Sequence, residues 1–274
     1  MKLSGAVRFA LAARAPDEVL DLEELTLGVA SLGKPDLDFA RVSRELDRLA
    51  AEVADDVTPS SPPDRVAAQL GSALGGRLGF KGHPGVFSAP GSSYLDEVLE
   101  TRSGLPILLS VVWILLGRRL GVPVEGVGFP GHFIACIDAP GARVYVDPFH
   151  GGVVREARDL MDRLPSVPRG VKPSDAARRL LEPTPVRPLV TRMLTNLKNL
   201  RIDQDDHEAA LAVVDRILLI GGEQAPEVRD RALLLLHLGR PTEAARDLRR
   251  YLVVEPEAPD RDVVEQLISR TEES

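Results

Sequence analysis

The sequence predicts an α+β protein with a mainly helical amino-terminal layer, a core with a small antiparallel sheet, and helix pairs at its carboxyl end. Three observations support this fold class. Apolar residues recur at helical spacing through the first hundred residues, three short β-type segments follow between residues 122 and 146, and a short segment is repeated after residue 188. The chain has 274 residues, of which 44% are hydrophobic and 27% charged, so disordered and fibrous classes are excluded.

The amino-terminal helices follow from the spacing of apolar side chains. One set of apolar residues recurs at alternating steps of three and four: Phe39, Val42, Leu46, Leu49 and Val53. This spacing is typical of an amphipathic helix. Three prolines between residues 58 and 63 end that helix, and a further helix is expected from about residue 64 to residue 78.

A central buried helix is predicted from Pro106 to a point before Gly121. Residues 107–116 are apolar on all sides of this helix except at Ser110, so it belongs inside a domain. Proline suits its first position, because no N–H is needed there.

Three β-type segments separated by glycine and proline predict a small antiparallel sheet: residues 122–127, 132–137 and 142–146. The last two form a hairpin whose turn lies within residues 138–141. In that register His132 lies directly opposite Asp147, with their Cβ atoms about 4.5 to 5.5 Å apart. A tighter turn at Pro140 and Gly141 makes the two residues diagonal neighbours on the same face. In both registers the two side chains can meet.

Six prolines between residues 165 and 188 indicate a linker, in which only residues 174–181 have a helical pattern. Beyond it, residues 207–211 resemble residues 242–246, an offset close to the 34-residue period of tetratricopeptide repeats. Two such helix pairs are fewer than the roughly three repeats needed for stability, so we expect them to pack against the rest of the chain. The predicted division is helical layer plus core, linker, and repeats: residues 1–164, 165–188 and 189–274.

Charge and cysteine content disfavour several classes of partner. Lys and Arg number 34 against 41 Asp and Glu, a net charge of −7, so the whole chain has no attraction for nucleic acid or an anionic membrane. The single cysteine, Cys136, cannot form an internal disulfide. The sequence has no targeting segment and no apolar run of the roughly 20 residues that span a membrane. We therefore expect a cytoplasmic protein without a nucleic-acid or membrane partner.

Four segments in this order resemble the core of the transglutaminase-like fold, a relative of papain-type cysteine proteases: Ser103–Pro106, Leu116–Pro123, Gly131–Phe133 and Val146–Phe149. In that core, a Cys at the start of a buried helix, a His on the following strand and an Asp or Asn on the next form a catalytic triad. Within the superfamily, the chain is most similar to the bacterial Sir-type invasion-regulator proteins, which join such a core to tetratricopeptide repeats.

The resemblance implies that His132 and Asp147 are the His and Asp of the triad, in agreement with the hairpin. The nucleophile does not carry over, because the Gly-x-Cys of the enzymes is matched by Gly104-x-Pro106, and proline has no nucleophilic atom. Loss of a triad nucleophile costs a serine protease on the order of 10⁶ in turnover. The resemblance therefore implies a degenerate triad.

The other candidate nucleophiles and ligands are interpreted as structural or loop residues. Cys136 lies roughly 13 Å from His132 along the strand, and we interpret it as an inert core cysteine. Ser103 is expected to cap the central helix, and Ser110 lies about one turn inside it. His83 and His150 are interpreted as loop residues, and no metal or cofactor is expected, because no H-x-x-x-H or similar spacing is present.

These patterns predict a non-catalytic protein-binding or regulatory module, a pseudoenzyme whose unknown protein partner binds through the repeats or the degenerate cleft. His132 and Asp147 are then a structural pair. The alternative is a hydrolase or acyltransferase in which this pair activates a water or a serine hydroxyl. A third interpretation is a purely structural scaffold.

Overall fold

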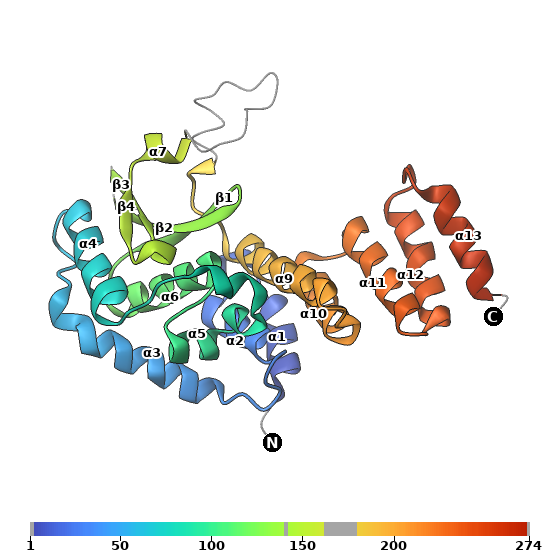
Figure 1. The fold of residues 1–274 in the computed structure, drawn as a ribbon, viewed down its shortest axis with the longest axis horizontal. Coiled ribbons are helices and arrows are strands. Elements are labelled where there is room, and N and C mark those ends of the chain that lie inside the picture. Colours follow the sequence, from blue (N-terminus) through green and yellow to red (C-terminus); the bar gives the residue numbers. More distant parts are fainter. Residues whose placement is uncertain (1–2, 140–141, 162–179, 273–274) are drawn as a thin grey trace. The chain divides into compact units, whose positions relative to one another are not determined.

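The computed structural model describes residues 3–139, 142–161 and 180–272 (Figure 1), and it confirms the predicted α+β class. Its contacts divide the chain into two compact units. We call residues 36–189 the core unit and residues 1–35 with 190–274 the repeat unit. The predicted domain boundaries stay a prediction, because a grouping by contacts does not test which parts fold independently.

The core unit contains five described helices: α3 (Phe39–Val53), α4 (Pro63–Leu70), α5 (Leu95–Thr101), α6 (Pro106–Arg119) and α7 (Ala157–Met161). Helix α3 has the predicted bounds, and its buried residues include all five of the predicted apolar set. The Asp38 side chain caps α3 by accepting a hydrogen bond from the backbone N–H of Arg41. Helix α6 is also confirmed, with every residue from Pro106 to Gly117 buried.

The helix expected over residues 64–78 is shorter than predicted. Helix α4 ends at Leu70, and the chain continues as a wider π-helical turn, η3 (Gly71–Arg77). The apolar spacing correctly placed the start of this segment. It could not show the change from α-helix to π-helix, which occurs in a segment rich in glycine.

The sheet has four antiparallel strands in the order β1 (Val124–Phe129), β2 (His132–Ala139), β3 (Ala142–Asp147) and β4 (Val153–Arg155). In the β2–β3 hairpin, Ile137 pairs with Val144 and Ala139 with Ala142. The register with His132 directly opposite Asp147 is therefore wrong, and the tighter alternative is present. Extending this register places Asp147 diagonal to His132. Strand β4 was not predicted, because three residues are too few to show a period.

Helices and loops cover both faces of the sheet. Helix α6 packs against β1 and β2, and α4 packs against β2, β3 and β4. A second group of buried residues joins the strands to Leu160 of α7 and to Leu181: Val127, Phe129, Ile134, Cys136 and Tyr145. The predicted helical segment 174–181 lies outside the described residues up to position 179.

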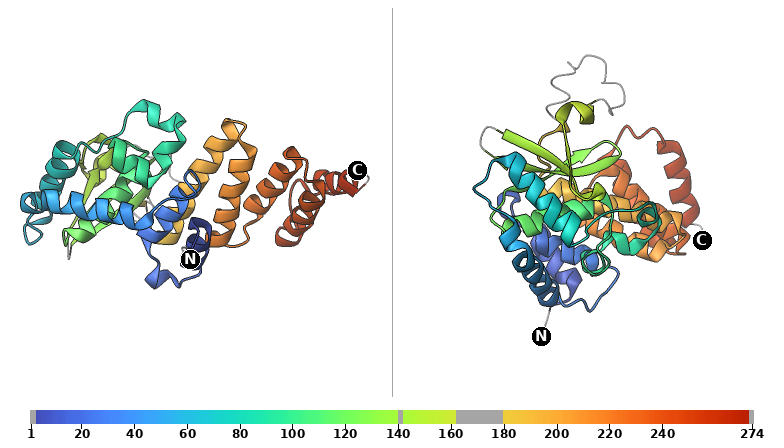
Figure 2. Two further views of the ribbon diagram at one scale, coloured as in Figure 1. Left: turned by 90° about the horizontal axis from the view of Figure 1, so that it is seen from below. Right: turned by 60° about the vertical axis from the view of Figure 1, so that its left-hand side comes forward.

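The repeat unit contains helices from both ends of the chain: α1 (Gly5–Ala13), α2 (Leu22–Ala30), α9 (Val186–Asp203, which begins in the core unit), α10 (His207–Gly221), α11 (Ala225–His237), α12 (Pro241–Val254) and α13 (Arg261–Glu272). Helices α10 to α13 pack in succession, as the orange-to-red ribbons of Figure 2 show. Ala210 and Ala245, equivalent positions of the sequence repeat, are both buried. Helix α1 packs against α2 and α10, so these two amino-terminal helices complete the repeats.

Among the described residues, no single helix is long and apolar enough to cross a membrane. Helices α5 and α6 meet the length and composition criteria only when taken together, and the chain bends by 85° between them.

Candidate functional site

The two predicted triad residues meet at one end of the β2–β3 hairpin. His132 is the first residue of β2, and Asp147 is the last residue of β3. His132 Nε2 lies 3.1 Å from Asp147 Oδ1, a hydrogen-bonding distance. The Asp147 side chain is 1% exposed and that of His132 is 21% exposed. The pair therefore joins a buried carboxylate to a partly accessible imidazole.

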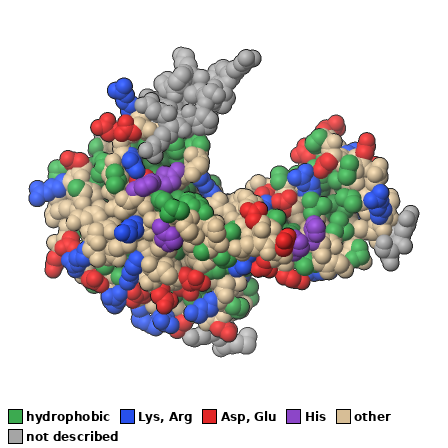
Figure 3. All heavy atoms as spheres, viewed as in Figure 1, with side chains coloured by type: hydrophobic (Ala, Val, Ile, Leu, Met, Phe, Trp, Pro, Cys, Tyr) green, Lys and Arg blue, Asp and Glu red, His purple; other side chains and the backbone are tan. Residues whose placement is uncertain are grey.

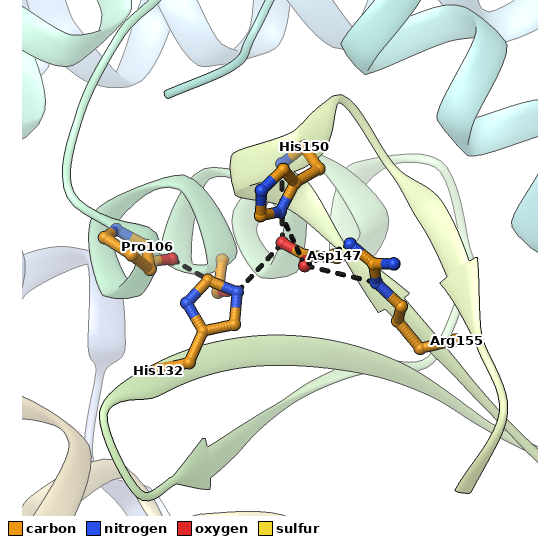
Figure 4. Close-up of polar contacts among 6 residues, drawn as sticks. Pro106, His132, Asp147, His150 and Arg155 are labelled. Carbon is orange, nitrogen blue, oxygen red and sulfur yellow. Dashed lines mark hydrogen bonds and ion pairs between the residues drawn. The ribbon is translucent and has the colours of Figure 1, made fainter. Parts of the chain in front are cut away.

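Pro106 lies at the same place. It is the first residue of α6, is fully packed in the core unit, and follows Leu105 at the N-cap. Helix α6 packs against β2, which begins at His132, and against the short 3₁₀ helix η6 (Pro148–His150), which directly follows Asp147. In the view of Figure 4 the His132 ring lies between Pro106 and Asp147. The structure thus brings all three predicted site residues together.

Two further residues, neither of them a predicted triad residue, bind the same carboxylate. His150 Nδ1 lies 2.8 Å from Asp147 Oδ2, and Arg155 Nη2 lies 3.2 Å from the same oxygen. His150 was interpreted as a loop residue, and its spacing of three residues from Asp147 was the available signal. In a 3₁₀ turn, residues three apart lie on one side. Arg155 had no such signal, because its contact depends on the unpredicted strand β4.

The environment of Asp147 favours its ionised form. Burial alone raises the pKa of Asp147, but the hydrogen bonds and positive charge of His132 and His150 outweigh it and hold the pKa well below its usual range. Arg155 adds a third partner, a guanidinium that is always positively charged. A buried carboxylate with three partners is satisfied, so it can contribute to folding as well as to chemistry.

Glycines shape the turn that carries His150. Gly151 and Gly152 have φ of 72° and 83°, a region that side chains disfavour. The Gly152 N–H donates to the Asp147 carbonyl at 2.8 Å, which closes the turn onto its first residue. The Gly82 N–H donates to the Phe149 carbonyl at 2.8 Å and ties the turn to a second loop.

The π-helical turn η3 packs directly on this glycine turn. A Cβ atom at Gly75 would lie 2.0 Å from the Gly151 carbonyl oxygen, and one at Gly71 would lie 2.9 Å from that of Gly152. Such close approach of two backbones requires glycine. Gly71 and Gly75 of η3 therefore form a packing contact with Gly151 and Gly152 that positions the His150 turn.

The other candidate nucleophiles are separate from His132. Cys136 is fully buried as predicted, and burial, the largest influence on its thiol, raises its pKa to about 12. Ser110 Oγ donates to the Pro106 carbonyl at 2.9 Å, within α6. Ser103 Oγ is buried and has no hydrogen-bond partner among the residues that the structure describes. The prediction that it caps α6 is wrong, since Leu105 is the N-cap. Within the described residues, neither serine hydroxyl is hydrogen-bonded to His132.

Aromatic rings flank the two histidines. The Phe149 ring meets the His132 and His150 rings edge-on, with centroids 6.0 and 5.3 Å away. Phe87, which is 56% exposed, lies 5.8 Å from Phe149. Figure 3 shows histidine side chains next to hydrophobic ones on one face of the core unit. The site is therefore accessible on one side and apolar at its edge.

Comparison with known proteins gives two family matches and several relatives. Residues 40–195 match the transglutaminase-like superfamily, and residues 197–269 match the tetratricopeptide repeat. A UPF0162 protein of Xylella fastidiosa is 35% identical over 92% of this chain and 90% of its own length. Protein SirB1 of Salmonella typhimurium is 25% identical over 85% and 87%, and UPF0162 protein YchA of Escherichia coli K12 is 26% identical over 82% and 83%. No solved structure matches the chain.

Proposed function

Because the chain belongs to the transglutaminase-like superfamily and joins that core to tetratricopeptide repeats, we propose that it is a non-catalytic protein-binding or regulatory module of the bacterial cytoplasm. One observation carries the proposal. Pro106 occupies the start of the buried helix beside His132, where the superfamily's enzymes have a thiol.

The surrounding chemistry supports this proposal. Acyl transfer through a triad needs a nucleophile within hydrogen-bond reach of the imidazole. Proline has none, Ser110 is bonded within its own helix, and burial keeps the Cys136 thiol protonated at neutral pH. Without a replacement, the loss of a triad nucleophile lowers turnover by about 10⁶. The retained His132–Asp147 pair then serves the structure of the hairpin.

The repeat unit favours a protein as the partner. Stacked helix pairs of this family present extended surfaces that bind other proteins. We propose that the partner binds the repeats or the degenerate cleft, where Phe87 adds an exposed aromatic ring.

A second candidate function rests on the intact His132–Asp147 hydrogen bond. In a hydrolase or acyltransferase, that pair would orient the imidazole to take a proton from a water molecule or a serine hydroxyl. The bond of 3.1 Å has the geometry for this role.

An assay of both reactions decides between the two functions. Purified full-length protein and its His132→Ala variant are incubated with amide and amine-acceptor substrates, and released ammonia and cross-linked product are measured. We expect neither protein to exceed the uncatalysed rate. Turnover by the wild type that His132→Ala abolishes would refute the non-catalytic function. A protein partner that co-purifies with the wild type from the native cell, and that the His132→Ala variant still binds, would support the non-catalytic function.

A further inference from the structure

The three residues around the buried carboxylate form a set of metal-ligand atoms. One nitrogen of His132, one nitrogen of His150 and a carboxylate oxygen of Asp147 all lie within 4.8 Å of one another. We propose that these three side chains bind a divalent first-row transition-metal ion, with Zn²⁺ as the reference ion. This goes beyond the proposed function, because a metal can bind whether or not the core is catalytic.

The ligand types and their separations suit such an ion. Zn²⁺ binds imidazole nitrogen and carboxylate oxygen at about 2.0 to 2.2 Å, so tetrahedral ligand atoms lie about 3.3 Å apart. Here His132 Nε2 lies 3.1 Å from Asp147 Oδ1, and His150 Nδ1 lies 2.8 Å from Asp147 Oδ2, so each nitrogen faces a different oxygen of the same carboxylate. One ligand atom from each of the three residues lies within 4.8 Å of the others, so the side chains would move closer together around the ion. Three protein ligands leave one coordination position for water or a bound group.

The nitrogens that face Asp147 are the ones that would hold the metal. They are His132 Nε2 and His150 Nδ1, each at hydrogen-bonding distance from the carboxylate. The ion would take the place of the hydrogens that lie between these nitrogens and Asp147. A neutral imidazole would move its hydrogen to the other ring nitrogen, and a protonated one would release one proton to solvent. The hydrogen-bonded cluster is thus the metal-free counterpart of the proposed site.

The ligands are held in place before a metal binds. Asp147 is buried, and Arg155 binds its Oδ2 from the side opposite His132 in Figure 4. Such a partner orients a ligating carboxylate from outside the coordination shell. The glycine turn ties His150 to the same carboxylate and packs on η3. The ligand side chains therefore lose little conformational freedom when the metal binds, and this preorganisation favours affinity.

A second histidine pair in the repeat unit provides the competing site and the control. The rings of His207 and His237 lie 4.6 Å apart, close enough to hold adventitious metal. His150→Ala removes a ligand of the proposed site, and His237→Ala breaks this other pair. The side chain of His150 is 50% exposed, so the substitution leaves no large cavity.

The test is titration of chelator-treated full-length protein with Zn²⁺ by calorimetry, with Mg²⁺ as a hard-cation control. We expect one Zn²⁺ per chain, a higher melting temperature with Zn²⁺, and no response to Mg²⁺. His150→Ala should weaken binding at least 100-fold, while His237→Ala leaves it within about twofold. Circular dichroism of the metal-free proteins checks that both variants are folded, and His150→Gln, which restores a hydrogen-bond donor, should also fail to bind. Binding unaffected by His150→Ala, binding lost in His237→Ala, or no binding by the wild type would each overturn the proposal.

Discussion

Asp147 accepts hydrogen bonds from two imidazoles and a guanidinium while its side chain is almost fully buried. An isolated carboxylate at that depth would be costly, so its partners decide whether it stabilises the fold. His132 was predictable from the hairpin, because both possible registers kept it on the same face as Asp147. The contact of Arg155 was not predictable, because it requires strand β4, and three residues are too few to show the alternating pattern of a strand.

Replacing Asp147 by Ala should destabilise the protein. The substitution leaves the two imidazoles and Arg155 without their shared acceptor, and we expect a loss of about 1 to 3 kcal/mol in the free energy of unfolding. Urea denaturation measures the loss, and Asp55→Ala, at an exposed position, is the control. An unchanged midpoint together with the loss of a biochemical activity would favour the catalytic alternative.

The same carboxylate makes stability depend on pH. The pKa of Asp147 is lowered in the folded protein, so the unfolded chain takes up its proton first as the pH falls. The contribution of Asp147 is therefore complete above its unfolded pKa of about 3.9 and is lost progressively below it. Between pH 6 and pH 3, wild type should lose more stability than Asp147→Asn. Parallel curves for the two proteins would show that Asp147 is not held as an anion.

Restoring a thiol at position 106 tests the interpretation of the degenerate triad. In Pro106→Cys, the thiol lies at the positive end of α6 and beside an imidazole, and both lower a thiol pKa. We expect it to react with iodoacetamide faster than Cys136 and to slow when His132 is also replaced by Ala. Alkylation at each site, followed by mass spectrometry against pH, measures this. If the introduced thiol had a pKa near about 8.5, like a free cysteine, position 106 would not be the position of the missing nucleophile.

At the scale of elements, regular periods predicted the helices that position the site, and backbone contacts determined the rest. The bounds of α3 follow from apolar spacing, and α6 from its uninterrupted apolar run. The hairpin register depends on which residues pair next to the turn, a choice between two turns that share one apolar pattern. The close contact of η3 with the glycine turn joins residues that are far apart in the sequence. In the sequence itself, this contact is visible only as glycine residues at the two places.

Gly75→Ala should therefore disturb the site through the backbone of the glycine turn. The added Cβ would lie 2.0 Å from the Gly151 carbonyl oxygen, so the backbone must move. We expect a loss of about 1 to 3 kcal/mol, as for other overpacked positions. Gly76→Ala is the matched control, because its Cβ would meet only the Gly71 carbonyl oxygen, at 3.9 Å. Thermal unfolding compares the two, and equal melting temperatures would contradict the packing argument.

At the scale of the molecule, the two ends of the chain form one unit. Arg216 of α10 donates to the Gly28 carbonyl at 3.0 Å, and its guanidinium lies over the Phe9 ring, 4.9 Å from the centroid. Phe9 is fully buried against this surface. Local spacing predicts the helices of residues 1–35 but does not identify their partner across the chain, so this packing could not be predicted from the sequence.

This packing predicts that residues 190–274 are weakly stable on their own. Without α1 and α2, the fragment exposes the apolar surface of α10 and leaves Arg216 without the Gly28 carbonyl, and too few repeats remain to compensate. We expect a broad thermal transition for this fragment, and a cooperative one when residues 1–35 are fused to it through a flexible Gly/Ser linker. Arg216→Ala in the fused protein should lower the melting temperature, because it removes both the hydrogen bond to Gly28 and the stacking on Phe9. Calorimetry with sedimentation measures stability and association together. A fragment 190–274 that melts cooperatively as a monomer would show that the repeats are stable without the amino-terminal helices.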